Sequence, residues 1–290
     1  MCLIGFRFDP DGRQPLLLAA NRDEFLSRPT AVAGWWSDAP GVYGGRDLQA
    51  GGTWMAISLP EFGPAGSRTC RFAALTNFRD GQTAGVDQRS RGELVTQLLT
   101  GTLPLRQNMQ AISARTDSYA GFNLIGFEWQ EVRSQARLEQ CRGWRLSNRG
   151  SETGTVRPIA PGTHGLSNGE FNEPWPKTRT LVNTLKQVDP DASREKTNQQ
   201  LLASLTSQRP VPDQELPSTG LPTRSERDLA CLFIRTALDT QTDTFAYGTR
   251  SSAVVRLSDS GRIAFEQWSW SAEAAEPRAD EYRRMETDRL

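Results

Sequence analysis

Histidine is almost missing from this chain, which holds a single one, His164, among 290 residues. Catalytic triads that depend on histidine, and metal sites built from several histidines, therefore have almost nothing to draw on. Cysteine is also scarce, and the four cysteines lie far apart with no CxxC spacing. This spacing indicates neither a zinc site nor a disulfide framework, so we expect reduced thiols, no bound metal and no required cofactor.

An excess of charge of either sign is missing too. The 34 Lys and Arg residues balance the 34 Asp and Glu residues, and no basic run with interleaved aromatics occurs, so we expect no nucleic-acid partner. No stretch approaches the roughly 18 uninterrupted apolar residues of a membrane span, and we expect no transmembrane segment. The apolar start is broken at Arg7, which does not fit a secretory signal, so the expected location is cytoplasmic.

Two extended stretches at the start of the chain predict a β-hairpin. Residues 2–8 alternate between two faces, and residues 15–21 form a second extended run. If the turn is centred on the Asp-Gly pair at 11–12, Cys2 pairs with Asn21. The hairpin then brings the polar cluster NRDE, which begins at Asn21, beside the start of the chain. A longer loop would shift this register by a residue or two.

Further strands are expected along the chain, with helices mainly in its middle. Strand-like segments occur at 52–58, 70–77, 121–129, 144–148, 164–168, 243–249, 251–258 and 262–270. Helical spacing of apolar residues occurs at 90–101, 174–188, 193–208 and 225–238. Strands at both ends with helices between them indicate an α+β protein with layers around one core.

The glycine-rich segment 41–54 lacks the strand-then-helix context of a phosphate loop. We interpret it as a turn and strand at the rim of a pocket. Residues 272–290 are strongly charged, and we expect a C-terminal helix or tail that follows a single domain over residues 1–271.

Cys2 is the first candidate for chemistry. Cysteine is small, so removal of Met1 should be permitted and would leave Cys2 as the first residue. Its thiol, with a reference pKa of about 8.5, would share that residue with an α-amine of pKa about 7.7–8.0, so one residue could supply both nucleophile and base. The alternative is that Cys2 is a small buried hydrophobe on its strand, as free cysteines usually are.

Polar side chains at strand ends could complete a site. Arg22 and Asp23 could hold the amine and the thiol, because a carboxylate accepts from an ammonium and an arginine favours a thiolate. Their alternative role is a polar strand end in which Asp23 caps a turn. Four further strand ends carry Asn77, Asn123, Asn168 and Arg250. An asparagine amide can donate to a developing oxyanion, although capping a turn is the commoner role of any single one.

Several motifs occur in an order that resembles the NRDE family, which includes the transport-and-Golgi-organisation proteins. They are MC at the start, LAANRDEF, GGRDLQAGGTW, AALTNFRDG, SRGELV, GFNLIG, GTHGLSN, PWPK and GTRSS. The resemblance runs from residue 2 to about residue 265. It implies an N-terminal nucleophile hydrolase-like fold, a four-layer αββα sandwich of two antiparallel sheets.

The chain also resembles, more faintly, the penicillin acylase and bile-salt hydrolase group, which cleaves a C–N amide bond with an N-terminal cysteine. This resemblance implies that Cys2 is the nucleophile and that Arg22 and Asp23 are its orienting charges. It further implies oxyanion roles for Asn77 and Asn168, and the arginine near the end of the domain for Arg250. The acylases separate their arginine and aspartate, whereas here the two are adjacent and alternate sides of the strand.

The resulting expectation is hydrolysis of a linear amide through a thioester on Cys2, with Asn21, Asn123 and His164 as binding residues. The alternative is a carrier that holds an amphipathic ligand such as haem or an acyl-CoA in the same pocket without chemistry, since members of the family are linked to haem trafficking and to lipid homeostasis. Haem can be held by histidine, cysteine, methionine or tyrosine, so His164 and the four cysteines are candidate ligands. A structural role with a vestigial site is the third hypothesis.

Overall fold

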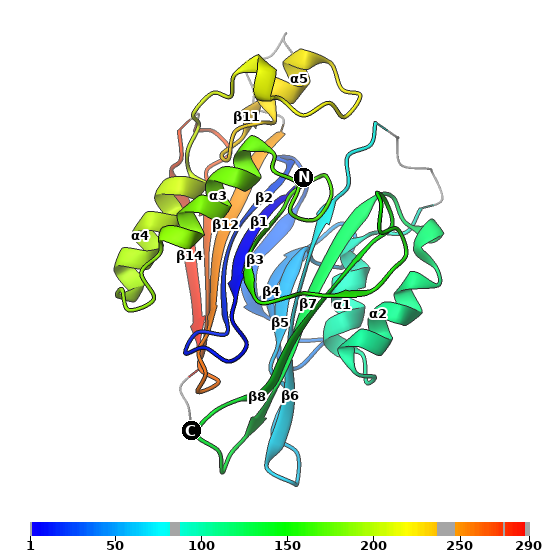
Figure 1. Cartoon of the computed structure of the whole chain (residues 1–290), viewed down its shortest axis with the longest axis vertical. Helices are drawn as coiled ribbons and strands as arrows, with labels where there is room; N and C mark the ends of the chain where they lie inside the picture. The colour runs from blue at the N-terminus through cyan, green and yellow to red at the C-terminus, as the bar shows by residue number, and fades with distance from the viewer. Residues whose placement is uncertain (1, 82–87, 237–246, 275, 288–290) are drawn as a thin grey trace.

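Two antiparallel sheets face each other in the computed structural model, which describes residues 2–81, 88–236, 247–274 and 276–287 (Figure 1). The first sheet has the order β10-β1-β2-β12-β13-β14, with β11 beside β12, and the second runs from β3 to β9 in sequence order. The strands of the first sheet are β1 (Cys2–Phe8), β2 (Leu16–Phe25), β10 (Gly162–Leu166), β11 (Arg235–Thr236), β12 (Tyr247–Leu257), β13 (Ile263–Trp270) and β14 (Ala279–Glu286). Those of the second are β3 (Thr30–Trp35), β4 (Val42–Asp47), β5 (Met55–Ser58), β6 (Ser67–Asn77), β7 (Phe122–Val132), β8 (Glu139–Ser147) and β9 (Arg157–Pro158).

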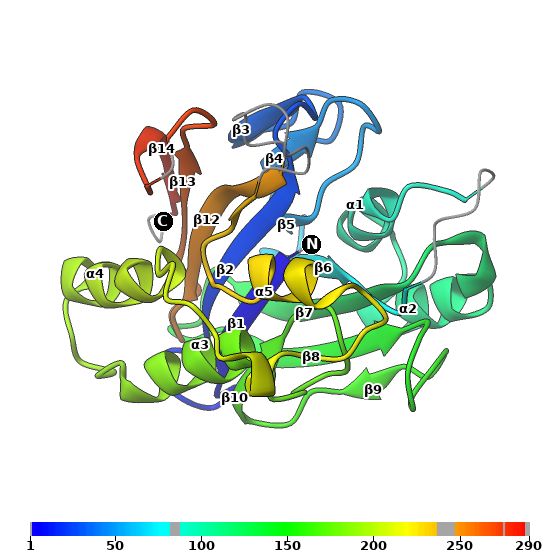
Figure 2. The same cartoon turned by 90° about the horizontal axis from the view of Figure 1, so that it is seen from above.

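Helices cover the outer face of each sheet, and both views show one helical pair on each side (Figures 1 and 2). α3 (Pro176–Gln187) and α4 (Arg194–Leu205) pack on the first sheet, and α1 (Gly92–Thr100) and α2 (Leu105–Ser113) pack on the second. Short helical turns occur at η1 (Thr116–Ser118), η2 (Asp213–Glu215) and α5 (Thr223–Asp228). The expected α+β class and the four αββα layers are therefore confirmed. No helix of the described residues is long and apolar enough to cross a membrane.

Alternation along β1 divides the core into layers. Ile4 and Phe6 point between the sheets, where the ring of Phe6 lies 5.4 Å from that of Phe127. Leu3 points the other way and packs with Leu181 of α3 in a separate cluster under the helices. A third cluster lies between the second sheet and α1 and α2. Burial on both faces explains why β1 is almost continuously apolar, as a central strand must be.

The predicted hairpin exists, but its register is one residue away from the prediction. Cys2 pairs with Arg22, and not with Asn21, because the connection is a loop over residues 9–15 and not a two-residue turn. The loop is closed by the Asp9 N–H, which donates to the Pro15 carbonyl at 3.0 Å. Since directly opposed residues share a face, this shift decides which polar side chain lies beside the thiol of Cys2.

Two other expectations are wrong. The helix predicted over 225–238 is only the short α5; the chain then turns and pairs β11 with β12, where Arg235 donates to the carbonyls of Thr249 and Ser271. The last two residues of the predicted helix, 237 and 238, lie outside the described residues.

The charged stretch 272–290 is neither helix nor tail over residues 279–286, which form the edge strand β14. Met285 packs into the core between the sheets while the charged side chains of β14 stay outside, a pattern suited to an edge.

Candidate active site

Cys2 lines a cavity of about 550 Å³ at one end of the sandwich. The cavity is bordered by both sheets and by the segment that leads into α1. Its lining residues are Cys2, Arg22, Asp23, Glu24, Phe25, Arg28, Thr30, Gly45, Arg46, Asp47, Thr53, Trp54, Leu75, Asn77, Gln88, Arg89, Ser90, Arg91, Gly92, Ala120 and Tyr247. The glycine-rich segment 41–54 therefore contributes to the wall of the cavity, as its interpretation as a pocket rim predicts.

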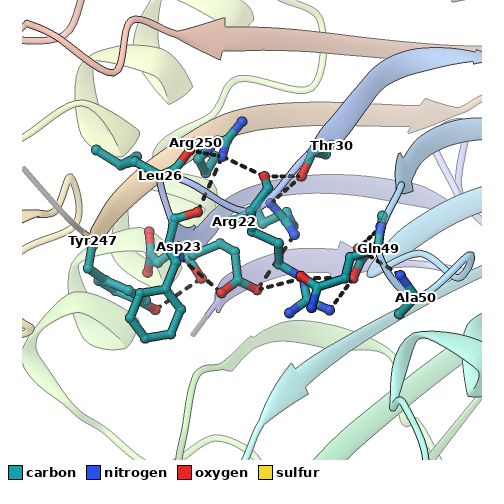
Figure 3. Close-up of polar contacts among 12 residues, drawn as sticks. Arg22, Asp23, Leu26, Thr30, Gln49, Ala50, Tyr247 and Arg250 are labelled. Carbon is teal, nitrogen blue, oxygen red and sulfur yellow. Dashed lines mark hydrogen bonds and ion pairs between the residues drawn. The ribbon is translucent and has the colours of Figure 1, made fainter.

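Arg22 lies on the same face of the sheet as Cys2. It is the pairing partner of Cys2 across β1 and β2, and opposed residues project to the same side. The Arg22 guanidinium donates to Thr30 Oγ1 at 3.3 Å (Figure 3) and lies 3.6 Å from Glu24 Oε2. Because this buried cation lies beside the thiol, it favours the thiolate form.

Asp23 projects toward the helical layer, as the alternation along β2 requires. Its Oδ1 accepts from Thr249 Oγ1 at 2.7 Å, and its carbonyl accepts from the Tyr247 hydroxyl at 3.0 Å (Figure 3). Burial raises the pKa of the Asp23 carboxyl, and the charge of Lys177 on α3 opposes that rise. Arg22 and Asp23 therefore project from opposite faces of the first sheet, and Arg22 is on the face that carries Cys2.

The Cys2 side chain is 5% exposed. Burial raises the pKa of its thiol, so the resting form is the neutral thiol. A nucleophilic role then requires a nearby base and a positive field, and Arg22 supplies part of that field. The carbonyl of Cys2 accepts from Ser167 Oγ at 3.3 Å, which fixes the start of β1 against the 167–169 segment.

Asn77 and Asn168 are in contact with each other, and Asn77 is the one that borders the cavity. Asn77, at the end of β6, lines it, whereas Asn168 is fully buried behind Asn77. The Asn168 Nδ2 donates to the Asn77 carbonyl at 3.0 Å, and its Oδ1 accepts from Lys177 Nζ at 3.4 Å. Asn77 is therefore the residue placed toward a ligand, and Asn168 supports its backbone.

Arg250 is hydrogen-bonded to the backbone at the turn between β2 and β3. Its Nη1 donates to the carbonyls of Phe25, Leu26 and Arg28 at 3.2, 2.7 and 2.9 Å (Figure 3). It is absent from the cavity lining among the described residues. Arg250 thus holds the cavity wall that carries Arg28, and its guanidinium is directed at the backbone.

The three residues expected to bind a ligand lie outside the lining of this cavity. Asn123 donates to Thr76 Oγ1 and to the Gly169 carbonyl, and it lines a separate cavity of about 160 Å³. The two ring nitrogens of His164 contact the Ala160 carbonyl at 2.9 Å and Asn172 Nδ2 at 3.0 Å. With both nitrogens engaged, His164 has no nitrogen left for a haem iron.

Asn21 joins the first sheet to the helical layer. Its Nδ2 donates to the carbonyls of Leu205 and Leu232, both at 2.8 Å, and its Oδ1 accepts from Ser252 Oγ at 2.6 Å. These partners lie more than 180 residues away along the chain. The amide is fully buried and its bonding capacity is largely used, so its position here is structural.

Asn21→Ala is expected to lower the free energy of unfolding by about 2–4 kcal/mol, because two buried carbonyls and a buried hydroxyl lose their partner. Urea denaturation followed by tryptophan fluorescence measures this change. The matched control is Asn183→Ala, which removes an exposed amide from α3 and should change stability by less than about 0.5 kcal/mol. Equal effects in the two variants would contradict the structural role of Asn21.

The sequence reasoning missed several charged residues of the site. Arg28 forms an ion pair with Asp47 at 2.7 Å, and Arg89 forms one with Glu93 at 2.7 Å. Arg91 lines the cavity with no acidic side chain within 4.0 Å among the described residues, and burial lowers the pKa of its guanidinium. These arginines belong to two motifs, RDEFLSR (22–28) and RSRGELV (89–95), whose charge was the available signal.

Comparison with known proteins gives consistent matches along the chain. Residues 1–271 match the family described as Transport and Golgi organisation 2. The Transport and Golgi organization protein 2 homolog of Bos taurus is 31% identical over 284 residues, and that of Homo sapiens is 30% identical over 283; each alignment covers 93% of both chains. Transport and Golgi organization protein 2 of Drosophila melanogaster is 29% identical over 280 residues, covering 91% of this chain and 90% of the fly protein.

Among solved structures, Anbu (ancestral beta-subunit) from Yersinia bercovieri aligns over 90% of this chain and 83% of its own. The TM-score is 0.40 and the sequence identity is 9%. A likeness of this size does not bear on activity.

Proposed function

Because the chain belongs to the Transport and Golgi organisation 2 family and places a cysteine at the wall of a cavity, we propose that it is an N-terminal cysteine hydrolase acting on a linear amide bond. The observation that carries the proposal is the position of Cys2, which lines the cavity on the same face as Arg22. The family name assigns no activity, so the chemistry is argued from the site itself.

In the proposed reaction, removal of Met1 frees the α-amine of Cys2. The amine takes the thiol proton, and the sulfur attacks the carbonyl carbon of the amide to form a C–S bond. Asn77, which borders the cavity, is the proposed donor to the oxyanion that develops on the carbonyl oxygen. The α-ammonium returns its proton to the leaving nitrogen as the C–N bond breaks, which leaves a thioester on Cys2.

Water then completes the cycle. The α-amine accepts a proton from water, the resulting hydroxide attacks the thioester, and the carboxylic acid leaves as the thiol is restored. Arg22 supports both steps, since its positive charge stabilises the thiolate that is formed and later expelled. The reaction requires a reduced thiol, and all four cysteines are free, which supports the cytoplasmic location that is part of this proposal.

A carrier of an anionic amphipathic ligand, such as haem or an acyl-CoA, is the second candidate. The observation in its favour is the set of arginines in the cavity wall: Arg22, Arg28, Arg46, Arg89 and Arg91. Guanidinium groups suit carboxylates and phosphates. If haem were the ligand, Cys2 would be the residue of the cavity that holds its iron, since His164 has both ring nitrogens engaged.

The test begins with the intact mass of protein purified without an N-terminal tag. We expect a mass lower than that of the full chain by one methionine, together with cleavage of at least one member of a panel of N-acyl amides. Protein that retains Met1 should show no turnover, because its Cys2 has no free amine. Retained methionine in the native protein would contradict the hydrolase, and saturable binding of haem or acyl-CoA without turnover would then favour the carrier.

A further inference from the structure

Lys177 is a lysine buried in a place that disfavours a positive charge. It is the second residue of α3 and is 2% exposed, whereas Lys186 on the same helix and Lys196 on α4 are exposed. An ammonium taken out of water loses several kcal/mol of solvation unless it is paired. The amino end of a helix also carries a partial positive charge, which repels a cation. Packing alone would not select lysine at this position.

The contacts of Lys177 lead to the site around Cys2. Its Nζ donates to Asn168 Oδ1 at 3.4 Å, and no carboxylate oxygen of the described residues lies within 4.0 Å of it. The same Asn168 Oδ1 accepts from Ser167 Oγ at 3.3 Å, and that hydroxyl also reaches the Cys2 carbonyl at 3.3 Å. On its other side, Asn168 donates to the Asn77 carbonyl at 3.0 Å. One amide therefore links Lys177 to the backbones of both Asn77 and Cys2.

Charges from several elements act on Lys177. Burial lowers the pKa of its ammonium to about 8. The negative charge of Asp23 opposes this fall, and the thiols of Cys2 and Cys231 also raise the pKa when they are ionised. The positive charge of Arg79 lowers the pKa further. Lys177 is in turn the largest charge that opposes the rise in the pKa of Asp23, ahead of Arg235. Burial is the largest cause of the raised pKa of the Cys2 thiol; Asp23 and Glu24 raise that pKa further, and Arg22 lowers it.

We propose that Lys177 is a positioning residue of the Cys2 site: its buried positive charge balances the Asp23 carboxylate, and its ammonium fixes the Asn168 amide behind Asn77. The inference rests on the proposed function in that Cys2 is the reactive residue. Without Lys177, Asp23 would keep its hydrogen bond from Thr249 and the charge of Arg235 but lose the largest charge that acts on it, so the field at the thiol would become more negative and oppose its ionisation. A buried lysine thus controls the reactivity of the cysteine that borders the cavity.

The test measures ionisation of the Cys2 thiol directly and needs no substrate. Cys2 is alkylated with iodoacetamide between pH 6 and pH 10, and its modification is followed by peptide mass spectrometry, which separates Cys2 from the other cysteines. In Lys177→Met, we expect the rate near pH 7.5, where the Lys177 ammonium is still charged, to fall by about tenfold, and the two profiles to converge above about pH 9, where the lysine of the wild type is neutral. Lys186→Met, on the exposed part of the same helix, should leave the profile unchanged.

A second pair of variants separates charge from packing. Asp23→Asn alone should raise the rate near pH 7.5, because it removes a carboxylate that opposes ionisation of the thiol. The double variant Asp23→Asn/Lys177→Met buries neither charge, so it should fold even if Lys177→Met does not, and its rate near pH 7.5 should return toward that of the wild type. Profiles that are the same with and without Lys177, in both the wild-type and the Asp23→Asn background, would overturn the inference.

The outcome is independent of turnover. A shift of the alkylation profile in a protein that cleaves no amide supports the role of Lys177 while the hydrolase proposal fails. Amide cleavage by a protein whose Cys2 profile ignores Lys177 overturns this inference alone.

Discussion

Cys2→Ala is expected to lower kcat/KM for amide cleavage by at least about 10³-fold, since removal of a nucleophile leaves only the contribution of binding and of oxyanion donors. The loss should appear in kcat, because the sulfur acts in the chemical step and contributes little to ground-state binding. The side chain is small and borders the cavity, so the fold should be retained. The measurement is steady-state cleavage of the amide that the panel identifies, with unfolding curves of both proteins.

The matched control for this prediction is Cys141→Ala. Cys141 is a buried free cysteine in the core between the sheets and is absent from the lining of the Cys2 cavity. Its replacement should cost some stability but leave turnover of the folded protein unchanged. Turnover that survives in Cys2→Ala would remove Cys2 from the mechanism. Ligand binding that is equal in wild type and Cys2→Ala, with no cleavage by either, would support the carrier.

Glu266→Ala is expected to lower the free energy of unfolding by about 3–5 kcal/mol, because it leaves the largely buried Arg256 without its counter-charge. Glu266 lies on β13 and is 1% exposed. Its Oε2 accepts from Arg256 Nη1 at 2.7 Å, and its Oε1 accepts from Asn198 Nδ2 at 3.0 Å and from the Tyr282 hydroxyl at 2.7 Å. The network joins α4, β12, β13 and β14, so its loss weakens the helical cover of the first sheet.

Urea denaturation measures this effect, with Asp213→Ala as the control. Asp213 also pairs with an arginine, Arg227, at 2.7 Å, but both side chains are about half exposed. An exposed pair of this kind contributes about 0–1 kcal/mol, because water already solvates both charges. Similar losses in Glu266→Ala and Asp213→Ala would show that burial does not set the strength of the Glu266 network.

The hairpin at the start of the chain shows what could be predicted from the sequence. The alternation of residues 2–8 between two faces and the apolar run that follows identify both strands, and each face of β1 enters its own core cluster. The same reasoning cannot measure a loop, and the register was therefore wrong by one residue. That single step determines that Arg22, and not Asn21, lies opposite Cys2.

The polar residues show where the prediction fails. An asparagine at a strand end has the same local sequence whether its amide meets a ligand, as Asn77 can, or buried carbonyls from distant helices, as Asn21 does. Lys177 is the opposite case, because a lysine among polar helical residues gives no local sign of burial. The partners that decide these roles come from other parts of the chain, and a short motif does not contain them.

The placement of β1 and β14 has a practical consequence for handling the protein. Cys2 lies at the cavity, whereas Glu286, the last residue of β14, lies near the other end of the first sheet. Glu286 pairs with Ala264, which stands in one row across the sheet with Arg256, Leu17 and Arg7. Anything fused ahead of Cys2 starts at the wall of the cavity and would both block the amine and obstruct entry. A purification handle, fluorophore or surface tether attached beyond β14 starts at the far end of the sheet, where it leaves the entrance open.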